Sequence, residues 1–182
     1  PTSLDIAVAR RELALEKRAA ELLHENQLSF YAPHPKQKAF HDNAIARYRY
    51  ARTGNRFGKS EMGAAEDVAF ALGYRPWIAE GDPARTLGIP SHPTKGLIVC
   101  TTWKKSREVF TEMETGGLGK LFKYIPKSRL GKPTKNHSGF IDRIPVRHIS
   151  GEWSVIFLDT IEGFKNNPLA QESSVHDWVH VD

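Results

Sequence analysis

Apolar and polar side chains recur along this chain with two different periods, and each period predicts one kind of element. Residues 3–26 carry apolar side chains at helical spacing, with arginine and glutamate between them, and Ser3 is suited to cap the first turn. The apolar positions are Leu4, Val8, Leu15, Ala19 and Leu22. This pattern predicts an amphipathic helix that forms an N-terminal arm over residues 1–30.

The remaining residues, 31–182, predict one domain in which strands and helices alternate. Apolar or alternating runs predict strands over residues 48–51, 97–100, 146–150, 153–158 and 178–182, with a hairpin between the third and fourth. Helix-forming runs occupy residues 36–46, 61–72 and 104–114. This order predicts an α/β fold with a mostly parallel central sheet flanked by helices.

Composition agrees with one ordinary folded domain. At 182 residues with 40% hydrophobic content, the chain is long enough to bury a sizeable core. It has no apolar run near the ~20 residues that cross a bilayer. The single cysteine, Cys100, lies in an apolar run, which favours a buried thiol in a reducing compartment over a disulfide or a metal ligand. The net charge of +5 suits an anionic partner without requiring one.

The most informative segment is residues 52–60, which read Arg-Thr-Gly-Asn-Arg-Phe-Gly-Lys-Ser. They lie between the strand predicted at 48–51 and the helix predicted at 61–72. Gly54 and Gly58 let the backbone curl so that successive N–H groups face one anion, at the positive end of the following helix. The context therefore predicts a phosphate-binding P-loop. The alternative is a surface turn that happens to end in Gly-Lys-Ser.

Lys59 and Ser60, at the end of this loop, are the side chains expected to bind phosphate and metal. Lys59 would reach the β- and γ-phosphates of a nucleotide, and the Ser60 hydroxyl would hold Mg²⁺. Asp182 ends the last predicted strand, where a P-loop protein has the acidic residue that supports the same ion. Thr53 departs from the usual motif, because a glycine is expected at that position.

Three segments, taken in order, resemble the ATPase domain of the large terminase subunit, the motor that packages bacteriophage DNA. Residues 33–41 (PHPKQKAFH) are similar to the glutamine-bearing stretch that precedes the nucleotide loop in such subunits. Residues 54–60 resemble their P-loop, which has a basic residue ahead of Gly-Lys and often replaces the first glycine. Residues 153–163 resemble the segment before the acidic strand. The likeness covers about residues 30–182, and its specificity lies in the combination and order.

The resemblance implies an ATP hydrolase that uses ATP and Mg²⁺ to move double-stranded DNA into a procapsid. Its partners would be DNA, the portal protein and the small terminase subunit, in a homo-oligomeric ring in the host cytoplasm and transiently at the procapsid portal. Lys59 and Arg56 would be catalytic, Arg56 by stabilising charge on the γ-phosphate. Ser60 and Asp182 would hold the metal, and Gln37 would contact adenine, with an exposed helix glutamine as an equal alternative. The nucleotide-binding set is Gln37, Thr53, Gly54, Asn55, Arg56, Phe57, Gly58, Lys59 and Ser60.

The same resemblance indicates what the 182 residues lack. In such subunits a glutamate that polarises the attacking water follows the strand-ending aspartate, and this sequence ends at Asp182. The family's C-terminal nuclease domain is not included either. We therefore expect these residues to bind ATP and to turn it over poorly, within a parent protein that is both an ATPase and an endonuclease.

A basic segment is the candidate DNA contact. Residues 120–147 hold eight lysines and arginines and one acid, Asp142. We assign Lys127, Arg129 and Lys132 to contact with the DNA backbone. A solvated basic loop is an equal alternative, because no aromatic stacking pattern accompanies the charges. His176 and His180 are interpreted as structural.

Two other classes of function remain open from the sequence. A helicase-like DNA-dependent ATPase would share the upstream glutamine, the P-loop and the acidic strand. A non-catalytic module that binds DNA or a portal would use the N-terminal helix for docking and retain the loop as a vestige. The intact Lys59 and Ser60 argue against the second of these.

Overall fold

The computed structural model describes residues 3–52, 54, 57–112, 116–166 and 175–182. Its helices are α1 (Ser3–Glu25), α2 (Pro35–Asp42), α3 (Lys59–Leu72), α4 (Trp103–Ser106), α5 (Lys120–Tyr124) and α6 (Ile161–Asn166). Short 3₁₀ turns lie at η1 (Gln27–Phe30), η2 (Pro83–Arg85) and η4 (Lys127–Arg129), and η3 (Arg107–Thr111) is a π-helical turn that continues α4. The strands are β1 (Lys95–Cys100), β2 (Thr134–Lys135), β3 (Ile141–Arg147), β4 (Trp153–Thr160) and β5 (Trp178–Val181).

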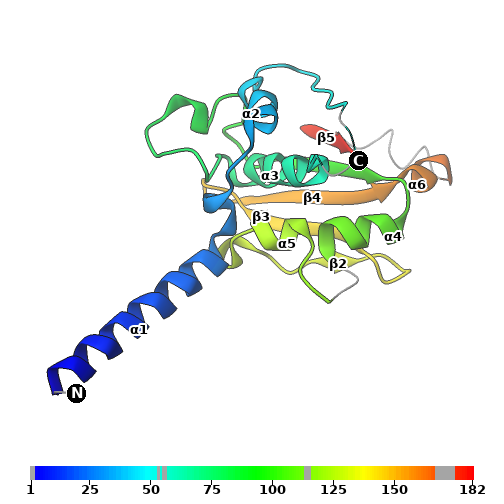
Figure 1. Ribbon diagram of the computed structural model, residues 1–182. Coiled ribbons are helices and arrows are strands. Elements are labelled where there is room, and N and C mark those ends of the chain that lie inside the picture. Colours follow the sequence, from blue (N-terminus) through cyan, green and yellow to red (C-terminus); the bar gives the residue numbers. More distant parts are fainter. Residues whose placement is uncertain (1–2, 53, 55–56, 113–115, 167–174) are drawn as a thin grey trace.

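The strands form one five-stranded sheet in the order β2-β3-β4-β1-β5, flanked by helices (Figure 1). The predicted α/β class is confirmed. The prediction that the sheet is mostly parallel is wrong, because the sheet is mixed. β1 is parallel to β4 and β5, whereas β3 is antiparallel to both β4 and β2. The reason is the hairpin through Gly151, since a tight turn can join only antiparallel strands.

Burial on one face of the sheet holds the domain together. In β4 the alternate positions from Ser154 to Thr160 are buried and the positions between them are half-buried. The buried face carries Ile98, Ile156 and Leu158, which form a cluster with the alanines and Val68 of α3. Such alternation is the pattern of a sheet packed on one side, and it sets α3 firmly against β1, β3 and β4.

Several predicted elements differ from the structure. The helix predicted over residues 104–114 is the short α4 followed by the π-helical turn η3, and the strand predicted over residues 146–150 is β3, which covers Ile141–Arg147. The helix predicted over residues 36–46 ends at Asp42, and the strand predicted over residues 48–51 is an irregular segment instead. The side chains of Tyr48 and Tyr50 are 83% and 87% exposed there. A strand needs a hydrogen-bonding neighbour, and none of the described strands pairs with this segment.

The N-terminal helix forms as predicted, as a long arm. α1 extends away from the rest of the molecule (Figure 1). Its apolar side chains stay largely in solvent, with Leu13 and Leu15 more than 60% exposed. Among the described residues, no helix is long and apolar enough to cross a membrane.

Candidate functional site

The candidate phosphate-binding loop leads directly into α3. Gly58 is the residue that caps the helix, with a φ of +79°. Only glycine adopts this left-handed conformation without strain, so the turn requires Gly58 itself. Lys59 and Ser60 then occupy the first turn of α3, where backbone N–H groups have no partner within the helix and the helix dipole is positive. This end of α3 is therefore suited to hold an anion.

The end of β5 meets the same turn. Ser60 donates a hydrogen bond from Oγ to Asp182 Oδ1 at 2.8 Å, across 122 residues of sequence. The backbone N–H of Asp182 donates to the carbonyl oxygen of Val99 at 3.0 Å, which ties this acidic residue to the central strand β1. The two residues that the sequence assigned to one metal ion thus lie in contact.

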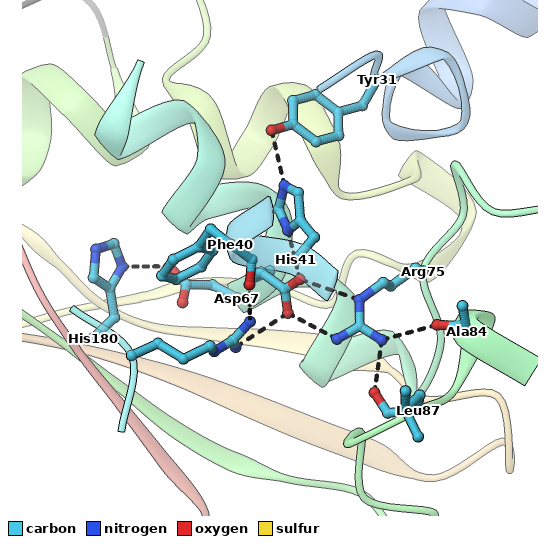
Figure 2. A network of polar contacts seen from close by, with 10 residues as sticks. Tyr31, Phe40, His41, Asp67, Arg75, Ala84, Leu87 and His180 are labelled. Atoms are coloured by element: carbon cyan, nitrogen blue, oxygen red, sulfur yellow. Dashed lines mark hydrogen bonds and ion pairs between the residues drawn. The ribbon is translucent and has the colours of Figure 1, made fainter. Parts of the chain in front are cut away.

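A second contact joins α3 to β5 behind this pair. His180 Nδ1 donates to Asp67 Oδ2 at 2.8 Å (Figure 2). The imidazole ring also lies against Gly63. Burial alone would lower the pKa of the His180 ring, but the Asp67 carboxylate outweighs burial and raises it. His180 is structural, as the sequence suggested, and it fixes the strand that presents Asp182.

The N-terminus of α2 packs on the loop. Gln37 is buried, and its Nε2 donates to the carbonyl oxygens of Gly58 and Phe57 at 3.3 and 3.5 Å. Its Oε1 accepts the backbone N–H of His34 at 3.1 Å. His34 Nε2 also lies 3.2 Å from the Phe57 carbonyl oxygen, and the two rings meet edge to face. The structure therefore brings Gln37 to the predicted loop, where its amide contacts the loop backbone.

A buried ionic network holds α2 and α3 together below the loop. The Glu66 carboxylate accepts a hydrogen bond from His41 Nδ1 at 2.6 Å, two from Arg75 at 3.1 and 3.2 Å, and one from Arg49 at 3.4 Å. Arg75 also donates to the carbonyl oxygens of Ala84 and Leu87, which anchors the long loop after α3 (Figure 2). One carboxylate thus connects four segments of the chain.

The groups around Glu66 stabilise the charged form of its carboxylate. Burial by itself raises the pKa of Glu66, but the hydrogen bond from His41, the charge and hydrogen bonds of Arg75 and the charge of Arg49 outweigh burial and lower the pKa to about 2. Nothing in the sequence pattern indicates this network. In an alanine-rich helix, Glu66 has the pattern of a solvated residue, and its hydrogen-bond partners come from three separate segments.

Glu61, next to Ser60, connects α3 to α5. It forms ion pairs with Lys123 at 3.2 Å and Lys120 at 3.7 Å and accepts a hydrogen bond from the Tyr124 hydroxyl. Burial and the neighbouring Glu61 carboxylate raise the pKa of Tyr124. Lys120 and Lys123, although 32% and 45% exposed, are therefore paired with α3 close to its first turn.

The three predicted DNA contacts differ in their surroundings. Lys127 and Lys132 are exposed. Arg129 instead donates to the carbonyl oxygens of Arg147 and His148, both at 3.2 Å, and its guanidinium lies over the ring of Tyr74. The two lysines therefore face solvent, whereas Arg129 links its turn to the residues at the end of β3.

The structure describes some of the remaining predicted site residues and not others. Gly54 is exposed with open space beside it, Phe57 is half-buried and Lys59 is exposed. Thr53, Asn55 and Arg56 lie outside the described residues. Cys100 is a buried free thiol as predicted, and burial raises its pKa to about 11.

The oxygen donors at the loop suit one particular kind of metal ion. Within the described ranges, no group of three or more histidine, cysteine, aspartate and glutamate side chains is placed to hold a metal. The contact between Ser60 and Asp182 instead offers one hydroxyl and one carboxylate oxygen. Mg²⁺ is commonly bound by one or two protein oxygens, with phosphates and water completing its coordination. The pair therefore fits Mg²⁺ that is bound together with a nucleotide.

Comparison of the chain with models of protein families, with curated proteins and with solved structures found no match.

Proposed function

We propose that this chain is a P-loop ATPase domain that binds Mg²⁺-ATP at the N-terminus of α3. The observation that carries the proposal is the 2.8 Å hydrogen bond between Ser60 Oγ and Asp182 Oδ1. A phosphate loop and an acidic strand end, 122 residues apart in sequence, meet at the carboxyl edge of the parallel strands β1, β4 and β5. In α/β sheets this edge is where ligands bind.

Each residue has a defined task in this proposal. The backbone N–H groups of the first turn of α3 donate to phosphate oxygens, and the Lys59 ammonium pairs with the β- and γ-phosphates. Ser60 and Asp182 hold Mg²⁺, which neutralises negative charge on the phosphates when it is bound. His180 and Asp67 keep β5 against α3, so that the Asp182 carboxylate stays beside Ser60.

The biological setting follows from the resemblance in sequence. We propose that ATP hydrolysis drives the translocation of double-stranded DNA into a procapsid, as in large terminase subunits. The excess of basic residues in segment 120–147 supports a DNA partner, through the exposed Lys127 and Lys132. Portal protein and small terminase subunit remain partners proposed from the resemblance alone.

Isothermal titration calorimetry with Mg²⁺-ATP tests nucleotide binding. Wild-type protein should bind, and Lys59→Ala should weaken the affinity roughly tenfold or more, because charge-assisted hydrogen bonds contribute roughly 1.5–3 kcal/mol each. Lys38→Ala is the matched control, since the exposed Lys38 pairs with Asp42 on α2. Equal affinity in wild type and Lys59→Ala would overturn the proposal.

A further inference from the structure

The side chain of Gln37 bonds both to the candidate loop and to the start of α2. Its Nε2 group donates to two loop carbonyl oxygens, that of Gly58 at 3.3 Å and that of Phe57 at 3.5 Å. Its carbonyl oxygen accepts the backbone N–H of His34 at 3.1 Å. Only 6% of the residue is exposed. To read a nucleotide base, this amide would have to leave two acceptors and enter solvent.

The loop at Gly58 and the start of α2 both favour the contact between Gln37 and the loop. A Cβ at Gly58 would lie 2.8 Å from Gln37 Nε2, so a larger residue at this position would displace the amide from its present place. Gln37 itself is held in place by the capping arrangement at the start of α2, in which His34 and Gln37 satisfy each other's polar groups. The amide is therefore positioned before any ligand arrives.

His34 contributes a second contact to the same carbonyl group. Its Nε2 lies 3.2 Å from the Phe57 carbonyl oxygen, and a carbonyl can only accept, so the ring donates from Nε2. The His34 ring also packs edge to face on Phe57, with centroids 4.6 Å apart. Two side chains from one turn of α2 therefore hold the last two residues before Lys59.

We propose that Gln37 and His34 are positioning residues that fix the exit of the phosphate loop, and that nucleotide-base selectivity does not depend on Gln37. This inference rests on the proposed nucleotide binding. Holding the carbonyls of Phe57 and Gly58 orients the peptide groups that lead into Lys59 and Ser60. Gln37 therefore contributes to binding of the phosphate groups. The affinity for any ligand with the same phosphate chain should depend on Gln37 to the same extent.

The test compares a nucleotide with a ligand that has no base. Calorimetry should measure Mg²⁺-ATP, Mg²⁺-GTP and Mg²⁺-tripolyphosphate against wild type, Gln37→Ala and His34→Ala, with Lys38→Ala as control. We expect Gln37→Ala to weaken all three ligands by the same factor, about tenfold, and to leave the ATP-to-GTP ratio unchanged. His34→Ala should act in the same direction to a smaller extent, and because His34 is exposed this variant keeps the fold.

The possible results distinguish a wrong role for Gln37 from a failure of the proposed nucleotide binding. If Gln37→Ala lowers ATP affinity but leaves tripolyphosphate affinity unchanged, Gln37 reads the base and the inference is wrong. The same holds if both variants bind all three ligands as tightly as wild type. If wild-type protein binds neither ATP nor tripolyphosphate, the proposed nucleotide binding itself fails. Gln37→Glu gives a second check, because a carboxylate beside two carbonyl oxygens should weaken all three ligands further.

Discussion

Ser60 and Asp182, 122 residues apart in sequence, share a hydrogen bond of 2.8 Å at the first turn of α3. This pairing depends on the fold in two ways. Gly58 turns the chain so that Ser60 begins the helix, and β5 pairs with β1 so that Asp182 emerges at the same edge. A hydroxyl and a carboxylate held this way are a ready pair of ligands for Mg²⁺.

The packing of β5 on α3 yields a prediction about Gly63. A Cβ at this position would overlap Cε1 of the His180 ring, so the ring or the helix must move. Gly63→Ala should therefore destabilise the protein by about 1–3 kcal/mol, as overpacking does elsewhere. Urea unfolding monitored by circular dichroism measures the change.

A double variant identifies the cause of that destabilisation. In a His180→Ala background, Gly63→Ala should cost nothing, and it should even add up to about 1 kcal/mol, because alanine favours helix over glycine. An equal destabilisation in both backgrounds would show that the ring of His180 is not the obstacle.

The buried Glu66 predicts a specific acid sensitivity. Its pKa in the folded protein is about 2, below the ordinary value of 4.5, so the folded state binds the proton less readily than the unfolded state. The resulting stability is complete above about pH 4.5 and disappears as the pH falls towards 2. The difference corresponds to about 3 kcal/mol.

Glu66→Gln isolates this contribution. The variant should be less stable than wild type at pH 7, because Arg75 keeps its burial and loses its counter-charge. The gap between the two proteins should narrow between pH 4.5 and 2 in urea unfolding. A gap that stays constant over this range would contradict the lowered pKa.

The exposed lysines of segment 120–147 carry the prediction for DNA. Lys127→Glu combined with Lys132→Glu should weaken duplex DNA binding and flatten the slope of log affinity against log salt by roughly 0.9 for each DNA phosphate that the protein no longer neutralises. Fluorescence anisotropy with a labelled duplex measures both quantities. ATP affinity should not change.

The control for this experiment carries the same change of charge elsewhere. Lys17→Glu with Arg18→Glu, both exposed on α1, alters the net charge equally. If the two double variants reduce affinity and slope to the same extent, the effect is one of overall charge and segment 120–147 does not bind DNA.

The sequence was informative where a short segment determines its own geometry. A turn with Gly58 before a helix-forming run predicts the helix N-terminus, and an apolar run before Asp182 predicts the strand that ends there. The hairpin predicted between residues 146–150 and 153–158 already requires one antiparallel pair, and β2, which the sequence did not predict, adds a second. The irregular segment at residues 48–51 was missed because strand pairing depends on which neighbours are present. Propensity alone identifies Tyr48 and Tyr50 as strand formers but supplies no partner strand.

The polar network around Glu66 could not be predicted for a related reason. A glutamate in a helix is usually solvated, and only the folded chain brings His41, Arg49 and Arg75 to one carboxylate. Likewise, the sequence placed Gln37 near a nucleotide through a resemblance. Its contact with the carbonyls of the loop becomes visible only in three dimensions.

In the proposed function, Ser60 and Asp182 hold the metal ion of a bound nucleotide. The most direct measurement is ATP affinity with and without Mg²⁺ in wild type, Ser60→Ala, Asp182→Asn and the double variant, with the exposed Asp42→Asn as control. Mg²⁺ should strengthen ATP binding to wild type and to the control. Each single variant should abolish most of that strengthening, and the double variant should show little further effect, because both residues act through one ion. If Mg²⁺ strengthens ATP binding equally in wild type and in the double variant, the metal site lies elsewhere and the claim is wrong.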